Sequence, residues 1–218
     1  MKVLVTGATD GIGARLVRDY LAAGHDVIAT GRRPEGPEGA RYVVADQTNP
    51  RAAALAIGGT VGDTLDVAIL NAGTGFVEDV PEQRAAETLD VNLAATILIA
   101  RAVAPAVLAA NGSLVVVGSV VHKSSKRIPT YAATKGGLHG FARALAEEWR
   151  GRAHVAALHP GPTDTSMLAK AGLDRLPPKW FLANADAVAR GIEHAVAKRH
   201  PSRTLTRLYC ARAKGVAA

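Results

Sequence analysis

The feature that most constrains the fold is a regular alternation of short apolar runs with longer stretches of helical periodicity. The short runs consist mainly of Val, Ile, Leu and Ala and are apolar throughout, not at every second position. Strands of this kind are buried on both faces, and helix-length connections make parallel neighbours of them. The expected strands are residues 3–5, 26–30, 41–45, 66–70, 113–117, 154–158 and, more weakly, 204–209.

Helical periodicity predicts the segments that cover this sheet on both faces. The half of the third helix from Leu89 to Leu108 is apolar nearly all round, so we expect it to pack against the sheet and against either its own chain or a subunit partner. About eight residues separate the second strand from the third, which leaves no room for a helix there. The expected helices are residues 14–24, 50–57, 82–110, 130–149 and 185–199.

No linker or internal repeat divides the chain. We therefore predict an α/β fold: a Rossmann-type doubly wound parallel sheet of about seven strands, forming a single domain over residues 1–218.

The first strand runs directly into a glycine-rich turn, Thr6-Gly7-Ala8-Thr9-Asp10-Gly11-Ile12-Gly13. In a strand–turn–helix unit, such glycines allow a tight turn, close approach of backbone to a pyrophosphate, and close packing of helix on strand. Amides at the helix N-terminus then face the phosphates. The alternative is a plain βα turn, but the position directly after a buried strand favours a dinucleotide site.

The end of the second strand indicates which dinucleotide binds. A preference for NAD requires a carboxylate there, whereas this strand ends Gly31-Arg32-Arg33. Guanidinium groups pair well with phosphate, so the 2′-phosphate of NADP is the expected ligand, with a surface pair of arginines as the alternative. Asp10 counts against NADP, because a cation at that turn position would help to hold the phosphate.

Further motifs follow the later strands in order, and together with the glycine turn they make the chain resemble the short-chain dehydrogenase/reductase family over roughly residues 1–200. Asp46 follows the third strand, Asn71-Ala72-Gly73 the fourth, and Pro160-Gly161 with Thr165 the sixth. Asn92, Ser119, Tyr131 and Lys135 are similar to the family's catalytic set.

The resemblance implies a cofactor site that draws on every one of these strand ends. Asp46 would meet the adenine, and the segment after the sixth strand would hold the nicotinamide carboxamide. The implied cofactor-binding residues are Gly7, Thr9, Asp10, Gly11, Ile12, Gly13, Arg32, Arg33, Asp46, Gln47, Asn71, Ala72, Gly73, Tyr131, Lys135, Pro160, Gly161, Thr163 and Thr165.

Tyr131 and Lys135 are four residues apart in PTYAATKGG, which places both on one face of a helix. A carbonyl that receives hydride needs a proton, and a free tyrosine titrates near 10. A lysine ammonium one turn away favours the phenolate, so we expect it to lower the pKa of the tyrosine. By the resemblance, Ser119 would hold the substrate oxygen, and Asn92 would fix the long helix and a water leading to Lys135.

Two departures from the family pattern concern the substrate side. Ser119 and Tyr131 are twelve residues apart, one fewer than is common in the family. The segment 166–183 is compact and carries Met167, Trp180 and Phe181 among other apolar residues. It is either a short substrate lid over a small or apolar carbonyl or plain packing.

Composition excludes several other functions. The net charge is +7, but Lys and Arg are dispersed without interleaved aromatics, so we expect no nucleic-acid partner. Cys210 is the only cysteine, and no signal peptide or membrane span is apparent, which predicts a cytoplasmic protein. The seven histidines show no HExxH or similar spacing, so we expect no metal. Gly118-Ser119-Val120 is not the GxSxG of serine hydrolases.

The sequence thus predicts an NADP-dependent oxidoreductase that moves hydride between NADP(H) and a small-molecule carbonyl or alcohol. A non-catalytic NADP-binding sensor or scaffold on the same fold is the alternative, and an epimerase or dehydratase is a second. The resemblance implies a homodimer or homotetramer. Neither the substrate nor the direction of the reaction follows from the sequence.

Overall fold

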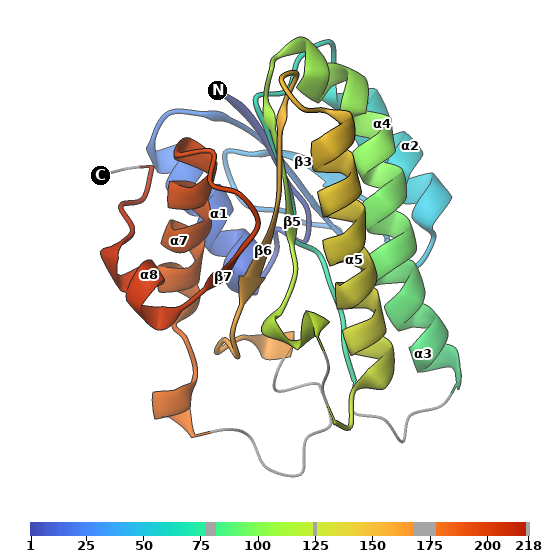
Figure 1. Cartoon of the computed structure of the whole chain (residues 1–218). Coiled ribbons are helices and arrows are strands. Elements are labelled where there is room, and N and C mark those ends of the chain that lie inside the picture. The colour runs from blue at the N-terminus through green and yellow to red at the C-terminus, as the bar shows by residue number, and fades with distance from the viewer. Residues whose placement is uncertain (77–81, 124–125, 168–177, 217–218) are drawn as a thin grey trace.

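The computed structural model describes residues 1–76, 82–123, 126–167 and 178–216. Seven strands form one sheet in the order β3-β2-β1-β4-β5-β6-β7, and every neighbouring pair is parallel (Figure 1). This confirms the predicted doubly wound sheet. The strands are β1 (Lys2–Val5), β2 (Asp26–Gly31), β3 (Arg41–Val44), β4 (Val67–Leu70), β5 (Ser113–Val117), β6 (His154–Pro160) and β7 (Arg203–Leu205).

Helices cover both faces of the sheet (Figure 1). One layer contains α2 (Pro50–Val61), α4 (Ala95–Ala109) and α5 (Pro129–Glu148). The other contains α1 (Gly11–Ala22), α7 (Ala185–Ala197) and α8 (Arg207–Arg212).

Each layer closes its own apolar core against the sheet, because alternate strand residues point to opposite faces. In β1, Leu4 belongs to the core beneath α4, whereas Val3 and Val5 belong to the core beneath α1. All three side chains are fully buried. The apolar strands of the sequence are therefore explained by burial on two sides, as predicted.

The end of the chain differs from the prediction. We expected a strand over residues 204–209, but β7 ends at Leu205 and α8 begins two residues later. Thr206 is the N-cap of α8, and its hydroxyl accepts a hydrogen bond from the Tyr209 amide at 3.1 Å. A threonine at a helix N-cap satisfies an amide that the helix cannot, and this local signal ends the strand.

No helix connects β2 to β3 in residues 32–40, all of which the structure describes, and this confirms the prediction. The connection instead packs on Tyr42, whose hydroxyl donates to the Arg33 carbonyl at 2.9 Å. A Cβ added at Gly36 would lie only 2.1 Å from the Tyr42 ring. One aromatic side chain thus fills the space that a connecting helix would cover.

The segment 82–110, which the sequence predicts as one long helix or two, contains a π-helical turn between two α-helices. It comprises α3 (Glu82–Leu89), the π-turn η1 (Asp90–Ala94) and α4. The run is long and apolar enough to span a membrane by length and composition, but half of its most apolar window is buried within this domain. Such burial is typical of a core helix.

Candidate active site at the carboxyl edge of the sheet

The carboxyl ends of the parallel strands lie along one edge of the sheet, and the strand order reverses between β1 and β4. Strands on either side of that point lead their chains in opposite directions, which opens a crevice where ligands of such sheets bind. The glycine turn follows β1 there, and Asn71-Ala72-Gly73 follows β4. These two motifs, far apart in sequence, therefore lie at the same place.

The glycines of the first turn are required by close packing. A Cβ at Gly13 would lie 2.1 Å from the Gly7 carbonyl oxygen, so no larger residue fits where α1 meets β1. A Cβ at Gly7 would lie 2.8 Å from the Ala72 Cα, which brings the two loops into backbone contact. Gly7 has a φ of 65°, a conformation that side-chain-bearing residues rarely adopt.

Asn71 locks the two loops together. Its side-chain Nδ2 donates to the Thr6 and Gly7 carbonyl oxygens at 3.0 and 3.3 Å, and its backbone amide donates to the Thr6 hydroxyl at 3.0 Å. The Ala72 amide donates to the same hydroxyl at 3.1 Å. Asn71 thus shapes the crevice by joining the loop after β4 to the turn after β1.

The segment after β6 also reaches the glycine turn. A Cβ at Gly11 would lie 3.2 Å from Thr165 Cγ2, and the Ser166 hydroxyl donates to Asp10 Oδ2 at 2.6 Å. Thr163 is buried, and its hydroxyl donates to the Gly161 carbonyl at 2.9 Å. The segment after β6 therefore lies against the glycine turn at Thr165 and Ser166.

Asp10 and Arg33 interact at the mouth of the crevice. The Asp10 side chain accepts a hydrogen bond from the Gly11 amide at 2.6 Å and so caps α1, and it lies 3.8 Å from an Arg33 guanidinium nitrogen. Arg33 also donates to the Thr9 carbonyl at 3.3 Å. Arg32 is exposed and makes no ion pair with any described residue. The two arginines are therefore not equivalent.

Gln47, after β3, has an unmet hydrogen-bonding group. Its side chain is buried, and its Oε1 accepts no hydrogen bond from any described residue. Asp46 beside it is exposed and accepts from the Thr48 amide at 3.0 Å. A buried acceptor without a partner costs free energy, so a donor from a bound ligand would relieve it. Together with the glycine cradle, Gln47 fits a dinucleotide.

Tyr131 and Lys135 lie on one face of α5, as their spacing predicted. Lys135 is buried, and its ammonium donates to the Val117 carbonyl at the end of β5 at 3.0 Å. The ammonium nitrogen lies 5.5 Å from the centroid of the Tyr131 ring. The lysine thus lies beside the phenol ring in a cation–π arrangement.

The expectation that the pKa of Tyr131 lies below that of a free tyrosine is wrong. Burial raises the pKa of Tyr131 to about 12, although a hydrogen bond with Ser119 acts in the opposite direction. Burial also lowers the pKa of Lys135 to about 8. Removing either group from water penalises its charged form, so the phenol stays protonated to higher pH and the ammonium loses its proton at lower pH.

The loop from Asn71 to Gly75 connects the glycine turn to Tyr131 and Lys135. A Cβ at Gly73 would lie 3.5 Å from the Lys135 Nζ, and one at Gly75 would lie 2.6 Å from the Tyr131 ring. The same loop is in backbone contact with Gly7 at its other end. The candidate cofactor turn and the candidate proton donor therefore belong to one site.

Asn92 holds this loop in place. The side chain lies in the π-turn η1 and is fully buried. Its Oδ1 accepts from the Thr74 amide at 2.7 Å, and its Nδ2 donates to the Thr74 carbonyl at 2.7 Å and to the Thr134 hydroxyl at 3.2 Å. Single π-turns in helices are frequent at functional sites. Asn92 is a positioning residue in this geometry, since these contacts occupy its amide.

Ser119 is the N-cap of the short turn η2 (Val120–His122), and its hydroxyl also accepts from the Val121 amide at 3.4 Å. It therefore lies at the end of β5, where it interacts with Tyr131.

Ile12 packs in the α1 core, and Pro160 ends β6. The central part of the predicted lid, residues 168–177, lies outside the described residues.

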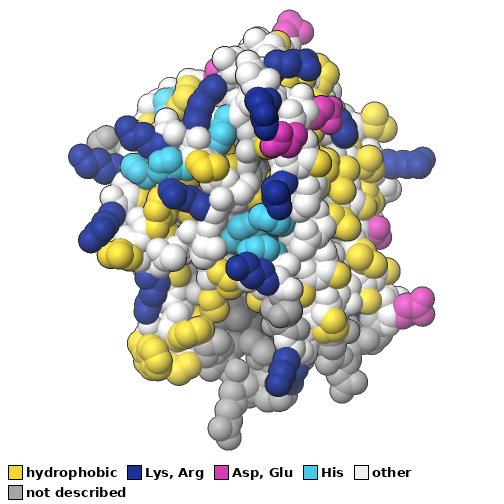
Figure 2. Space-filling model, in the orientation of Figure 1, with side chains coloured by type: hydrophobic (Ala, Val, Ile, Leu, Met, Phe, Trp, Pro, Cys, Tyr) yellow, Lys and Arg dark blue, Asp and Glu magenta, His cyan; other side chains and the backbone are white. Residues whose placement is uncertain are grey.

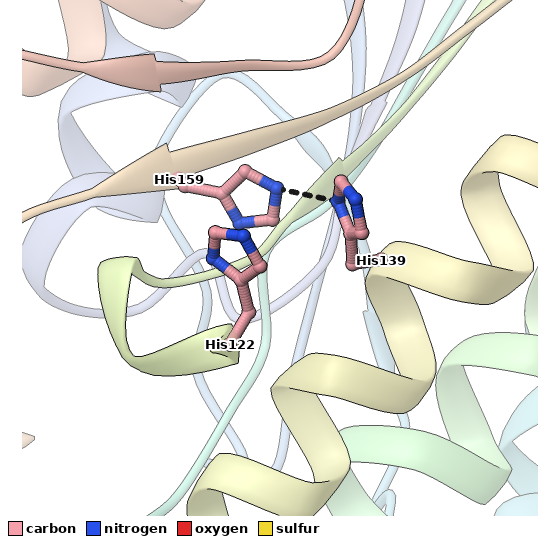
Figure 3. Close-up of side chains that lie close together, drawn as sticks. All are labelled: His122, His139 and His159. Atoms are coloured by element: carbon pink, nitrogen blue, oxygen red, sulfur yellow. Dashed lines mark hydrogen bonds between the residues drawn. The ribbon is translucent and has the colours of Figure 1, made fainter. Parts of the chain in front are cut away.

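A cluster of three histidines, which no motif in the sequence predicted, lies close to this site. His122 from η2, His139 from α5 and His159 from β6 converge (Figure 3). His159 is buried, and burial together with the nearby imidazoles lowers its pKa to about 4. The three come from three different elements, so no local spacing motif exists; the positions of His139 one turn after Lys135 and of His159 beside Pro160 were the available signals.

The chain belongs to the short-chain dehydrogenase/reductase family. Residues 1–176 match the model of the family described as short chain dehydrogenase. Members of this family are oxidoreductases, so the class of protein that the fold and crevice define is an oxidoreductase of this family.

The relatives and solved structures agree with this assignment. D-threitol dehydrogenase from Mycolicibacterium smegmatis is 30% identical, with 85% of this chain and 82% of the relative covered. The structure of a candidate NAD(P)-dependent gluconate 5-dehydrogenase from Beutenbergia cavernae, with NADP bound at low occupancy, is 29% identical with a TM-score of 0.80, covering 96% of each chain. A short-chain dehydrogenase from Sphingobium yanoikuyae in complex with NADPH has a TM-score of 0.80 at 24% identity, covering 93% and 87%.

Proposed function

We propose that this protein is an NADP-dependent oxidoreductase that transfers hydride between NADP(H) and a carbonyl or alcohol, with Tyr131 as the proton donor. The observation that carries the proposal is the loop Asn71–Gly75, which contacts the glycine turn at one end and Tyr131 and Lys135 at the other. When bound, the nicotinamide supplies the hydride. The protein supplies orientation and the proton.

The raised pKa of Tyr131 fits the role of an acid in the reducing direction. At neutral pH the phenol stays protonated, so its hydrogen is available when charge develops on the substrate oxygen. The Lys135 ammonium then stabilises the phenolate as it forms. Ser119 holds the substrate oxygen, and Asn92 fixes the loop against which both side chains pack.

The exposed Arg32 supports NADP rather than NAD. Asp10 partly neutralises Arg33, so we assign the 2′-phosphate chiefly to Arg32. A guanidinium pairs with phosphate through two parallel hydrogen bonds, whereas the two ribose hydroxyls of NAD offer no charge to it. The NADP bound to the structure from Beutenbergia cavernae is a second support.

NADPH oxidation against a panel of aldehydes, ketones and sugar-derived carbonyls tests the function. We expect turnover with at least one compound, and a loss of about a hundredfold or more in Tyr131→Phe, as typical for removal of a general acid. NADPH binding, followed by fluorescence, should persist in that variant. A non-catalytic sensor predicts NADPH binding without turnover on any compound, and full activity in Tyr131→Phe would remove the tyrosine from its role.

Cofactor choice has a separate test. Arg32→Asp should weaken NADPH binding about tenfold or more and leave NADH binding much less affected, because the loss of one charge-assisted phosphate pair costs about 1.5–3 kcal/mol. Arg33→Asp is the matched comparison and should have the smaller effect. Equal losses for both cofactors in Arg32→Asp would contradict the assignment.

A further inference from the structure

The three histidines converge closely enough to share one ion. One ring nitrogen from each of His122, His139 and His159 lies within 4.8 Å of the others (Figure 3). His139 Nδ1 and His159 Nε2 are 3.0 Å apart. In a tetrahedral zinc site with Zn–N bonds of about 2.0–2.1 Å, ligand nitrogens lie about 3.3–3.4 Å from one another. Two of the three nitrogens are therefore already close to ligand spacing.

We propose that His122, His139 and His159 form a binding site for a divalent transition-metal ion of the Zn²⁺ class, with an open fourth position. Imidazole nitrogens are ligands that Zn²⁺, Cu²⁺ and Ni²⁺ prefer, while Mg²⁺ and Ca²⁺ prefer oxygen. Three histidines and one open position are a set that zinc accepts.

The tautomers of the rings fit this role. The His122 Nδ1 lies 2.8 Å from the Ser119 carbonyl oxygen, so this nitrogen carries the proton and Nε2 is left as the ligand atom. A metal-binding histidine commonly donates its second N–H to a backbone carbonyl in this way. His139 and His159 share one hydrogen between facing nitrogens, and a change of tautomer in one ring frees both lone pairs without loss of a proton.

The His159 ring is fixed by packing. The side chain is 2% exposed, and its Nδ1 makes no hydrogen bond with a described residue. A Cβ at Gly118 would lie 2.3 Å from that Nδ1, so the glycine gives the ring its place against β5. His122 stacks on His159 with ring centroids 4.0 Å apart and lies half-buried in the short turn η2.

The charges around the cluster set the expected affinity. Burial lowers the pKa of His139, and the charges of His122, Arg143 and Lys123 act in the same direction. Burial likewise lowers the pKa of His159, and Lys135 adds to this shift. These cations also repel a divalent ion. Figure 2 shows histidine side chains at the surface of this face, with Lys and Arg around them. We therefore expect micromolar rather than much tighter binding, with water or an anion in the fourth position.

Binding is measured on protein produced without a histidine tag and treated with a chelator that is then removed. Zn²⁺ is titrated in competition with a chromophoric chelator, and Co²⁺ absorption reports tetrahedral coordination. We expect one ion per chain with a Kd on the order of 10 µM, weaker than a complete four-ligand zinc site, because one position is open and nearby cations repel the ion. His122→Ala and His139→Ala should each weaken binding at least tenfold.

His194→Ala is the matched control, because His194 packs edge-on against His200 and Tyr209 in a separate group of rings. It should leave Zn²⁺ affinity unchanged. Circular dichroism and NADPH binding check that every variant is folded, so this outcome is independent of any substrate turnover. Absence of binding up to about 1 mM Zn²⁺, or binding retained in a His122→Ala/His139→Ala double variant, would overturn the proposal.

Discussion

Each helical layer buries a side chain that is charged at neutral pH in water, and the two side chains differ in what surrounds them. Lys135 of α5 and Glu193 of α7 are 3% and 1% exposed. Burial lowers the pKa of Lys135 to about 8 and raises the pKa of Glu193 to about 7. Both shifts move the group toward its neutral form, so each charge costs free energy of folding at some pH.

The surroundings of the two buried groups differ in a way that bears on the proposed function. The Lys135 ammonium donates to Val117 and lies beside Tyr131 in the candidate active site. The Glu193 Oε2 accepts from the Val216 amide at 3.1 Å, and its Oε1 has no partner among the described residues. We infer that the buried Lys135 ammonium destabilises the fold but takes part in the proposed reaction. The buried Glu193 carboxylate also destabilises the fold, and it has no role in that reaction.

Lys135→Met gives the largest expected effect. If the ammonium stabilises the phenolate of Tyr131, turnover should fall by about a hundredfold to ten-thousandfold. Steady-state NADPH oxidation with a substrate found for the wild type measures this. Activity within a few-fold of the wild type would contradict this contrast between the layers, because the buried charge of Lys135 would then contribute no more to turnover than that of Glu193.

The same substitution should stabilise the protein at neutral pH. The pKa of Lys135 is lower in the folded state, so its charge costs up to about 3 kcal/mol below pH 8. Between pH 8 and 10.5 the unfolded chain binds the extra proton, and wild-type stability rises with pH. The gain from Lys135→Met in urea unfolding should therefore be largest at pH 7 and below about 1 kcal/mol at pH 10. If Lys135→Met instead lost stability at pH 7, the hydrogen bonds of the Lys135 ammonium would compensate the cost of burying its charge.

Glu193→Gln should show the opposite pH dependence. The pKa of Glu193 is raised in the folded state, so the carboxylate costs about 2–3 kcal/mol above pH 7 and little below pH 4.5. The variant should gain stability at pH 8 and less than about 1 kcal/mol at pH 5. The glutamine can still accept from the Val216 amide. Turnover should stay unchanged, and a parallel loss of activity would contradict the contrast between the layers.

The sequence predicted those parts of the site that depend on local order. The glycine turn, the Asn71 motif and the Tyr131–Lys135 pair each occupy one strand end or one helical turn, where spacing alone sets direction. The parallel sheet followed because apolar strands and helices alternate. Once the order of the strands was known, the motifs had to meet at one edge.

Features that depend on how deeply a side chain is buried, or on how three or more helices and strands are placed together, could not be predicted from the sequence. The raised pKa of Tyr131 depends on how much water the loop after β4 excludes. The interaction of Asp10 with Arg33 depends on where the shortened β2–β3 connection places the guanidinium. The cluster of His122, His139 and His159 needs β5, α5 and β6 to be placed correctly together.

Tyr20→Phe should have the smallest effect and sharpens the description of the α7 layer. Tyr20 is fully buried, its hydroxyl has no hydrogen-bond partner among the described residues, and burial and the charge of Glu193 raise its pKa. Replacing an unsatisfied buried hydroxyl by hydrogen should be neutral or stabilising by up to about 1 kcal/mol. Urea unfolding at pH 8 measures it, with Glu193→Gln/Tyr20→Phe as the double variant. If Tyr20→Phe instead destabilised the wild-type protein but not the Glu193→Gln variant, the phenol would be donating to the Glu193 carboxylate, and that charge would be partly compensated.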